Sequence, residues 1–213
     1  MNLSELRGRI RKDLHDEDSS SYRWADAALD RHIDHALREL GEATPQQAKA
    51  TLQTGAGSRE LSMASLTGLI AVEAVEYPTG LYPPAYVPFS LWGGTLTLLT
   101  ERVPSSGEQV NVYYGKAHVV DANGSTAPAH LEDLLAMGAE AYAALEWASY
   151  ATNRVNVGGA DTWREYQLWG QERLASFLAG LARHGRRNAV RVRRLYAPAL
   201  PTGSQSTDWG PGA

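Results

Sequence analysis

The chain opens with hydrophobic residues at helical spacing. They recur every three or four positions, which gathers them on one face of a charged helix: Leu3, Leu6, Ile10 and Leu14. Asn2, followed three residues later by Glu5, has the form of a capping pair for this helix. The polar run 15–21 then interrupts the period with small side chains that compete for backbone hydrogen bonds, so we expect a loop there.

A second helix is predicted from Ala25 to Glu42. Its apolar positions again follow the helical period, and Thr44-Pro45 ends it because the residue before a proline avoids the helical conformation.

Residues 50–121 change to short β-rich runs. The runs are separated by turn sequences of Gly, Pro and Ser, as in antiparallel sheets. They are Thr51–Thr54, Glu60–Met63, Leu69–Val75, Thr95–Thr100 and Gln109–Tyr114. This pattern predicts an inserted β unit of five or six strands.

The helical period returns after residue 126. Pro128 suits a first helical turn, and a buried face continues from there to about Thr152. A fourth helix is predicted from Asp161 to His184, with one apolar side: Trp163, Tyr166, Trp169, Leu174, Phe177, Leu178 and Leu181. The short connection between them predicts an antiparallel hairpin.

This order of elements predicts an α+β fold. Two N-terminal and two C-terminal helices form a four-helix bundle domain, residues 1–48 and 122–184. An antiparallel β subdomain, residues 49–121, is inserted between them. An extended C-terminal arm, residues 185–213, completes the chain.

Charge is distributed unevenly along the chain. Residues 1–182 hold 14 basic and 23 acidic side chains (net −9), whereas residues 183–213 hold 6 basic and 1 acidic (net +5). The end of the chain is also rich in Pro, Gly and Ser, a composition that cannot build a core. We therefore interpret it as an arm that orders on a partner.

Residues 190–193 alternate valine and arginine. An extended strand of this pattern presents valines on one side and guanidiniums on the other, which suits addition to a partner's sheet edge. Trp209 is a candidate anchor for a pocket on another chain. The candidate partner-binding residues are Arg183, Arg186, Arg187, Val190, Arg191, Val192, Arg193, Arg194, Tyr196 and Trp209. A solvated helix end and direct phosphate binding are the alternatives for the same arginines.

Composition and spacing exclude several chemistries. The chain has no cysteine, which rules out disulfides, thiolate metal sites and cysteine nucleophiles. His32 and His35 lack the i, i+4 spacing and third ligand of helical zinc sites, so we expect them on a solvated or intersubunit face. Residues 16–18 resemble the start of a calcium loop but lack its later glycine and glutamate. We expect no catalytic residue, metal or cofactor, and hence no enzyme.

The length of the apolar runs and the polar start of the chain bear on its location. The longest runs fall well short of a membrane span, and residues 1–5 form a polar helix start where a secretory leader would be apolar. We expect a soluble, cytosolic chain without a membrane partner.

Aromatic residues cluster with prolines in the β insertion. They are Tyr77, Tyr82, Tyr86, Phe89 and Trp92. Such a cluster is typical of a small core under a Pro-rich loop, and the alternative is a platform for a sugar or peptide.

The N-terminal part of the chain carries a resemblance to a known family. The positions that carry it are residues 10–17, residues 22–26, Leu29, Asp30 and Ile33. They resemble the opening of the head-to-tail adaptor (head-completion) proteins of tailed bacteriophages: a charged helix, a loop and a Trp-x-Asp-x-x-Leu helix start. Ala25 stands where that family commonly has Ser or Thr, which leaves Asp26 to accept from the free amides of the helix start. Residues 127–134 and 163–181 look like the family's third and fourth helices.

The resemblance implies a structural role in the virion neck. It implies a homo-oligomeric ring of about twelve copies beneath the portal protein, extending the DNA channel and facing the next neck or tail protein. The resemblance also implies synthesis in the host cytoplasm, an arm that docks to the portal, and passage of DNA through the channel without specific binding.

Two other functions stay open on the residues alone. One is a DNA-binding module that grips the duplex backbone with the Arg-rich tail. The other is an accessory protein that binds a glycan or peptide with the aromatic cluster at residues 77–92.

Overall fold

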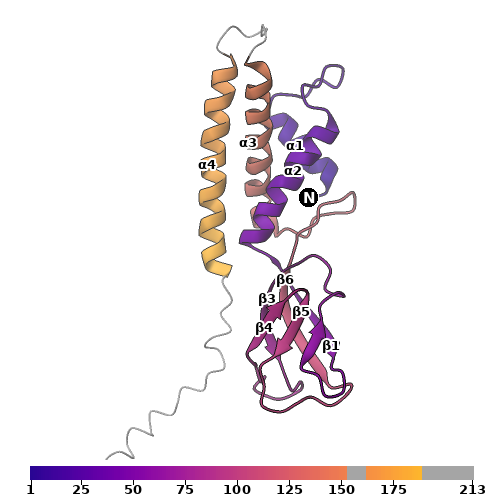
Figure 1. Cartoon of the computed structure of the whole chain (residues 1–213). Helices are drawn as coiled ribbons and strands as arrows, with labels where there is room; N and C mark the ends of the chain where they lie inside the picture. The colour runs from indigo at the N-terminus through magenta and orange to yellow at the C-terminus, as the bar shows by residue number, and fades with distance from the viewer. Residues whose placement is uncertain (153–161, 189–213) are drawn as a thin grey trace, which may run out of the picture. The chain divides into compact units, whose positions relative to one another are not determined.

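The computed structural model describes residues 1–152 and 162–188, with side chains through Gly185 (Figure 1). It confirms the α+β class: the described residues contain four α-helices and two small antiparallel sheets. The chain divides into two compact units. The helical unit comprises Met1–Gln47 and Gly115–Arg187, and the β unit comprises Ala48–Tyr114.

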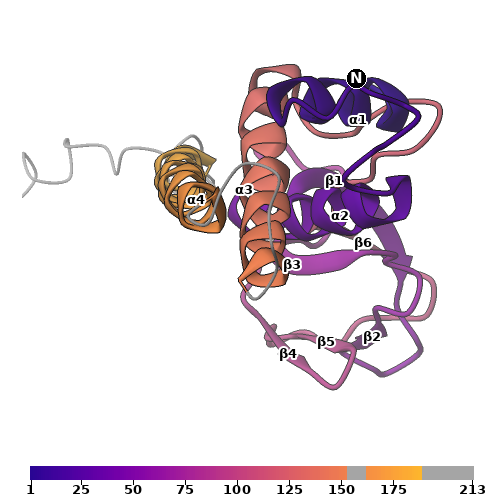
Figure 2. The ribbon, with the colours of Figure 1, turned by 90° about the horizontal axis from the view of Figure 1, so that it is seen from above.

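The helical unit contains four α-helices and one turn of 3-10 helix. Their bounds are α1 Leu3–Asp13, α2 Asp26–Ala43, η1 Ala129–Leu131, α3 Glu132–Ala151 and α4 Thr162–Asn188. Within this unit, α3 lies between α4 on one side and α1 and α2 on the other (Figure 2). The predicted helices are confirmed, with two changes. Pro128 precedes η1 and not α3, and α4 runs four residues beyond His184.

The predicted helix capping is confirmed at α1 and wrong at α2. At α1 the Glu5 amide donates to Asn2 Oδ1 and the Asn2 amide donates to Glu5 Oε2, both at 2.9 Å, so the predicted capping box is present. At α2 the N-cap residue is Ala25, and no side chain caps the helix. Asp26 does not accept from the helix start because its carboxylate pairs with arginines of α1.

All four helices contribute to one hydrophobic core. Its fully buried side chains include Leu6, Ile10, Leu29, Ile33, Leu40, Leu131, Leu135 and Phe177. α3 is buried on most of its circumference and is rich in alanine, which lets neighbouring helices approach closely. Leu178, expected on the buried side of α4, is instead 46% exposed.

Glycines create the close contact between α3 and α4. A Cβ atom on Gly138 of α3 would lie 2.8 Å from the Phe177 ring of α4, and one on Gly180 of α4 would lie 2.5 Å from a Leu134 methyl of α3. Each helix therefore has a notch that receives a side chain of the other.

The β unit holds two three-stranded sheets with the orders β1-β6-β3 and β2-β5-β4. The strands are β1 Gln46–Gln53, β2 Glu60–Ser62, β3 Leu69–Glu76, β4 Phe89–Trp92, β5 Thr95–Leu98 and β6 Gln109–Lys116. β4 was not among the predicted runs, because the prolines before it mask its alternation. A core separate from the helical one fills this unit: Leu61, Leu66, Val75, Tyr77, Leu96, Leu98, Val110 and Val112.

The segment that follows β6 is attached to the helical unit. His118 Nε2 lies 2.8 Å from the carbonyl oxygen of Thr44, and the Leu3 amide donates to the carbonyl oxygen of Asp121 at 2.9 Å.

Among the helices that the structure describes, none combines the length and apolarity needed to span a bilayer.

Candidate interaction surfaces

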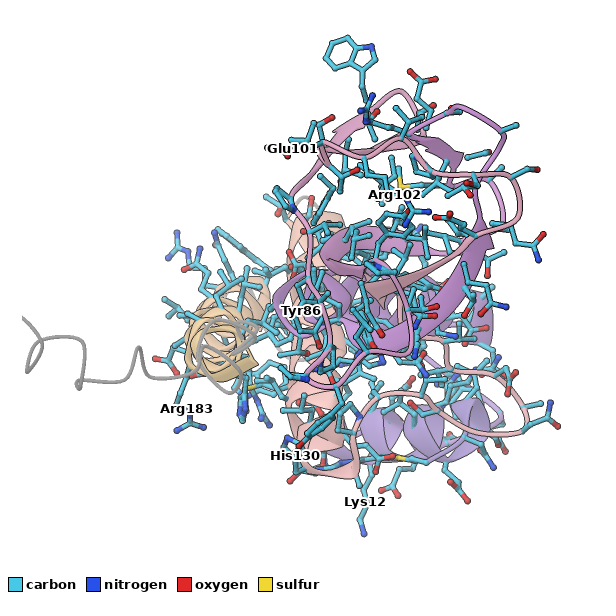
Figure 3. All side chains as sticks on the ribbon, turned by 90° about the horizontal axis from the view of Figure 1, so that it is seen from below. Lys12, Tyr86, Glu101, Arg102, His130 and Arg183 are labelled. Atoms are coloured by element: carbon cyan, nitrogen blue, oxygen red, sulfur yellow. The ribbon has the colours of Figure 1, made fainter. Side chains whose placement is uncertain are left out.

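The predicted arm lies mostly outside the described residues. Arg183 is exposed on the last turns of α4 and projects away from the other helices (Figure 3). Arg186 and Arg187 belong to α4 by its bounds, but their side chains are outside the described part. The remaining candidates are outside it altogether: Val190, Arg191, Val192, Arg193, Arg194, Tyr196 and Trp209.

The segment that carries the family resemblance forms a buried ionic clamp between α1 and α2. Arg11, only 7% exposed in its side chain, donates to Asp16 Oδ2 at 2.7 Å. Its other nitrogen donates to the Trp24 carbonyl at 2.8 Å and to Asp26 Oδ1 at 2.7 Å. Asp16 also accepts from the backbone amides of Arg23, at 2.7 Å, and Trp24, at 3.3 Å.

This clamp engages the carboxylates of Asp16 and Asp26. Asp16, which begins the sequence that resembles a calcium loop, is buried and uses both oxygens on Arg11 and on backbone amides. The hydrogen bond from Arg11 holds the pKa of Asp26 below its usual value. We conclude that these residues order the loop between α1 and α2.

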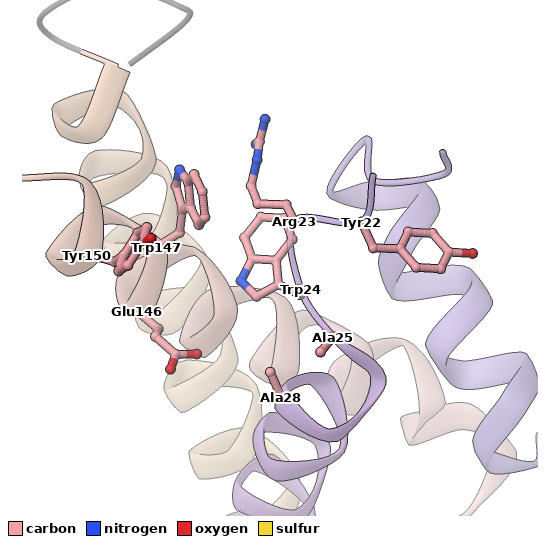
Figure 4. A pocket seen from close by; sticks show the side chains of 8 residues that line it. All are labelled: Tyr22, Arg23, Trp24, Ala25, Ala28, Glu146, Trp147 and Tyr150. Atoms are coloured by element: carbon pink, nitrogen blue, oxygen red, sulfur yellow. The ribbon is translucent and has the colours of Figure 1, made fainter. Parts of the chain in front are cut away.

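An aromatic pocket lies where this loop meets α3. It encloses about 410 Å³ and is lined by Tyr22, Arg23, Trp24, Ala25, Ala28, Glu146, Trp147 and Tyr150 (Figure 4). We call Arg23, Trp24, Trp147 and Tyr150 the aromatic cage. Trp147 and Tyr150 come from one side of α3, and Arg23 and Trp24 face them from the loop before α2 (Figure 4).

Ring contacts and hydrogen bonds hold the cage in place. The Trp24 and Trp147 rings lie 5.7 Å apart, and the Trp147 and Tyr150 rings 5.3 Å apart. The Trp24 indole N–H donates to the carbonyl oxygen of Ala143 at 3.1 Å, which anchors the buried ring to α3. Tyr150 is 52% exposed, so the cage opens to the surface.

Arg23 supplies the positive charge of the cage. Its guanidinium lies 5.0 Å from the Trp147 ring centre and 5.5 Å from that of Trp24, within the range of a cation–π contact. It also donates a hydrogen bond to the Tyr166 hydroxyl of α4. The cage therefore combines aromatic walls with a cation that is already positioned.

Glu146, which lines the pocket, pairs with His32 of α2. Its carboxylate lies 2.5 Å from His32 Nε2 and accepts from Arg31. Burial works against ionisation, but these two partners keep the pKa of Glu146 below its usual value. Burial lowers the pKa of His32, which is 7% exposed, so the expectation of a solvated face is wrong for this residue.

His35 is used in packing. Its ring stacks on Tyr142 with centres 4.1 Å apart.

In the part of the chain that the structure describes, no group of three or more acidic or histidine side chains is placed to hold a metal ion.

The aromatic cluster of the β unit divides into buried and exposed members. Tyr77 lies in the core, and Phe89 packs against it. Tyr82 and Trp92 are 92% and 88% exposed. The prediction of a small core is therefore right for two of these residues and wrong for Tyr82 and Trp92.

The sequence contained only a partial signal for these surfaces. Trp147 and Tyr150 stand three residues apart on a predicted helix. Trp24 belongs to the segment that resembles the adaptor family. Their meeting depends on packing between residues more than one hundred positions apart, which no local pattern encodes.

Comparison with known proteins gives distant likenesses among solved structures. No family model and no curated protein matches the chain. Among solved structures, it is similar to a chain from the neck of an empty GTA particle computed with C6 symmetry, with 14% identity and a TM-score of 0.28, covering 79% of this chain and 88% of that one. It is also similar to a chain from the neck of a native GTA particle computed with C12 symmetry, with the same identity and TM-score, covering 78% and 86%. A TM-score of 0.28 does not establish a common fold.

Proposed function

We propose that this chain is a structural adaptor of a phage-like particle. In this proposal, copies assemble as a ring that joins the portal to the neck or tail and extends the DNA channel. The observation that carries it is the buried clamp of Arg11, Asp16 and Trp24. Residues that resemble the adaptor family hold α1 to the start of α2, and no residue is assigned a catalytic role.

The distribution of charge supports the same proposal. The net charge of −9 on residues 1–182 disfavours tight contacts to phosphates, which suits a channel through which DNA must slide. The tail, with a net charge of +5, suits docking to an acidic face of the portal, and ordering only on docking makes assembly sequential.

The proposal is tested by binding to purified portal-bearing capsids. The full chain should bind and form rings on them, and a chain ending at His184 should not bind. Two further variants separate charge from chain length: all six tail arginines replaced by glutamine, which should abolish docking, and the same six replaced by lysine, which should keep most of it. If the chain ending at His184 bound as well as the full chain, the role of the arm would be refuted.

The density of arginine in the tail favours DNA binding as a second candidate function. Six arginines within twelve positions would make binding to duplex DNA fall steeply with added salt. A mobility-shift titration distinguishes the two candidates, because the adaptor should bind duplex DNA weakly at every salt concentration.

Exposure of Tyr82 and Trp92 favours the third candidate, an accessory glycan- or peptide-binding protein. A glycan array that shows specific binding, lost in the Trp92→Ala chain while ring assembly persists, would support it over the adaptor.

A further inference from the structure

The helix α4 carries apolar residues on two sides. One side packs on α3 through Phe177 and includes Leu181, and both side chains are buried. On the other side Leu168 is 63% exposed and Leu178 is 46% exposed. A surface helix ordinarily has one apolar stripe, which faces the core of its own chain. The second apolar side therefore points to a partner outside the helical unit.

The exposed residues of this second side follow the spacing of a contact between two helices. They recur at alternating intervals of three and four residues: Leu168, Gln171, Ala175, Leu178 and Ala182. We call these residues the α4 seam. The seam is about 21 Å long at a rise of 1.5 Å per residue. All of its residues are exposed, and α4 lies at the outer edge of the helical unit, with α3 on one side of it (Figure 2).

Two opposite charges flank the α4 seam on the same side. Glu165 and Arg183 are 18 residues apart. This separation is five full turns at 3.6 residues per turn, so both side chains leave the helix in the same direction. Both are exposed, and neither has an ion-pair partner among the residues that the structure describes. They stand on either side of Ala175, the middle of the seam, so this flank is acidic at one end and basic at the other.

We propose that two copies of this chain pair through their α4 seams in an antiparallel, two-fold contact. Antiparallel helices that meet at Ala175 bring Glu165 of one copy beside Arg183 of the other, offset by about 3 Å along the axis at 1.5 Å per residue. The two-fold axis forms this ion pair twice. A parallel pair would instead bring like charges together at both ends, which is unfavourable.

The sizes of the seam residues fit the same register. Leu168 of one copy faces Ala182 of the other, and Ala175 faces its own counterpart, so a large side chain meets a small one and the helices can approach closely at the centre. Because the surface complements itself in both charge and size, a second copy is a better occupant than another protein or the tail of the same chain.

The other charges near the seam do not oppose this register. Glu172, on the same flank as Glu165, faces Ser176 of the second copy and meets no like charge. Arg164 lies beyond the end of the seam, and its guanidinium is 5.2 Å from the centre of the neighbouring Trp163 ring. The contact therefore extends from Glu165 to Arg183.

This contact is different from the ring of the proposed function. A two-fold contact is complete with two copies, whereas a ring requires two different surfaces to meet. The inference therefore goes beyond the proposed function, and it is tested on the full chain in solution without portal or capsid.

Sedimentation equilibrium of the full chain should show a dimer. Leu168→Glu should weaken dimerisation at least about tenfold, because it places a carboxylate against Ala182 in a seam that loses its water. Leu99→Glu is the matched control, since Leu99 is 54% exposed and lies in the β unit. It should change dimerisation by no more than about twofold. Circular dichroism shows whether both variants keep their fold.

Charge reversal tests the antiparallel register directly. Glu165→Arg and Arg183→Glu should each weaken dimerisation about tenfold at low salt, because each variant alone brings like charges together twice. An equal mixture of the two variants should dimerise to within about threefold of the wild type, since each copy then supplies the charge that the other lacks. The double variant should recover in the same way.

Three results would overturn the inference. A full chain that sediments as a monomer at every concentration would show that no second copy covers the seam, whether the tail or another protein does. Self-association that persists unchanged in Leu168→Glu would place the contact elsewhere on the chain. A mixture of the two charge variants that stays monomeric would exclude the antiparallel register. Docking to portal-bearing capsids is measured separately, so each of these results leaves the adaptor proposal to its own test.

Discussion

At the scale of single residues, the buried polar side chains of Arg11 and Asp16 serve the structure. Arg11 and Asp16 are both buried and are joined to each other and to the backbone of the loop before α2. A buried ion pair of this kind contributes little against an apolar replacement, but the loss of one partner is costly because the other charge stays buried.

We therefore predict that Asp16→Ala destabilises the chain by about 3 kcal/mol, because it leaves the Arg11 guanidinium without its buried partner. Urea unfolding followed by circular dichroism measures this change. Glu17→Ala, at the exposed neighbouring position, is the control and should change the unfolding free energy by less than about 0.5 kcal/mol. Equal effects of the two substitutions would show that the clamp does not matter for stability.

Glu140 is a second residue whose burial has a measurable consequence. It lies on α3, is 1% exposed, and has Arg173 of α4 at 3.3 Å from its Oε2. Burial, with a further contribution from a hydrogen bond to Asp13, raises the pKa of Glu140 to about 7. Between the unfolded value of 4.5 and about 7, the folded state holds a proton that the unfolded state has released.

This difference in bound protons predicts that stability falls as pH rises from about 4.5 to 7 and changes no further above that range through this group. The lost contribution is about 3 kcal/mol for a displacement of this size. Glu140→Gln should remove most of this dependence, so that the variant is less sensitive than the wild type to a change from pH 5 to pH 8. Parallel urea unfolding curves at the two pH values test this, and an unchanged dependence in the variant would contradict it.

At the scale of elements, small residues decide how α4 packs on α3. The notch at Gly138 receives the Phe177 ring. A Cβ atom added to Gly138 would also lie 3.0 Å from the Cβ of Ala36 of α2. Substitution there forces the neighbouring side chains to move within a packed core.

We predict that Gly138→Ala destabilises the helical unit by about 1–3 kcal/mol, although alanine has the higher helix propensity. Gly8→Ala on α1 is the matched control, because Gly8 is exposed and a Cβ there meets nothing within 4 Å. That substitution should stabilise by up to about 1 kcal/mol. Thermal unfolding of both variants tests the pair, and stabilisation by both would mean that the notch is not tight.

At the scale of the whole molecule, the chain carries two separate cores. One is shared by the four helices, and the other lies within the β unit and is filled from both of its sheets. The two units therefore have independent sources of stability, and damage to one core need not spread to the other.

Val75→Ala tests this independence, since Val75 is fully buried in the β unit. We expect a loss of about 2 kcal/mol confined to that unit. Hydrogen exchange read by mass spectrometry should show faster exchange in Ala48–Tyr114 and unchanged exchange in α2 and α3. Loss of protection in both units together would show that they unfold as one.

Most of the helices and strands were predictable because their signals are local. The apolar period of Leu3 to Leu14, the capping pair of Asn2 and Glu5 and the stop at Thr44-Pro45 each involve residues within a few positions of one another. Prediction failed where a distant partner intervened. Asp26 does not cap α2 because Arg11 and Arg7 take its carboxylate, and β4 needs β5 to be recognised as a strand.

The amino-acid sequence by itself therefore determined the order and type of the elements, the α+β class and the contrast between an acidic body and a basic tail, because periodicity and charge are properties of the chain alone. Only the tertiary structure decided which aromatic residues are buried and which are presented. Trp24 meets Trp147 through packing across more than one hundred residues, and strand register turns Trp92 outward while Leu96 turns inward. Burial depends on which distant segments come together, and that is settled by the lowest free energy of the whole fold.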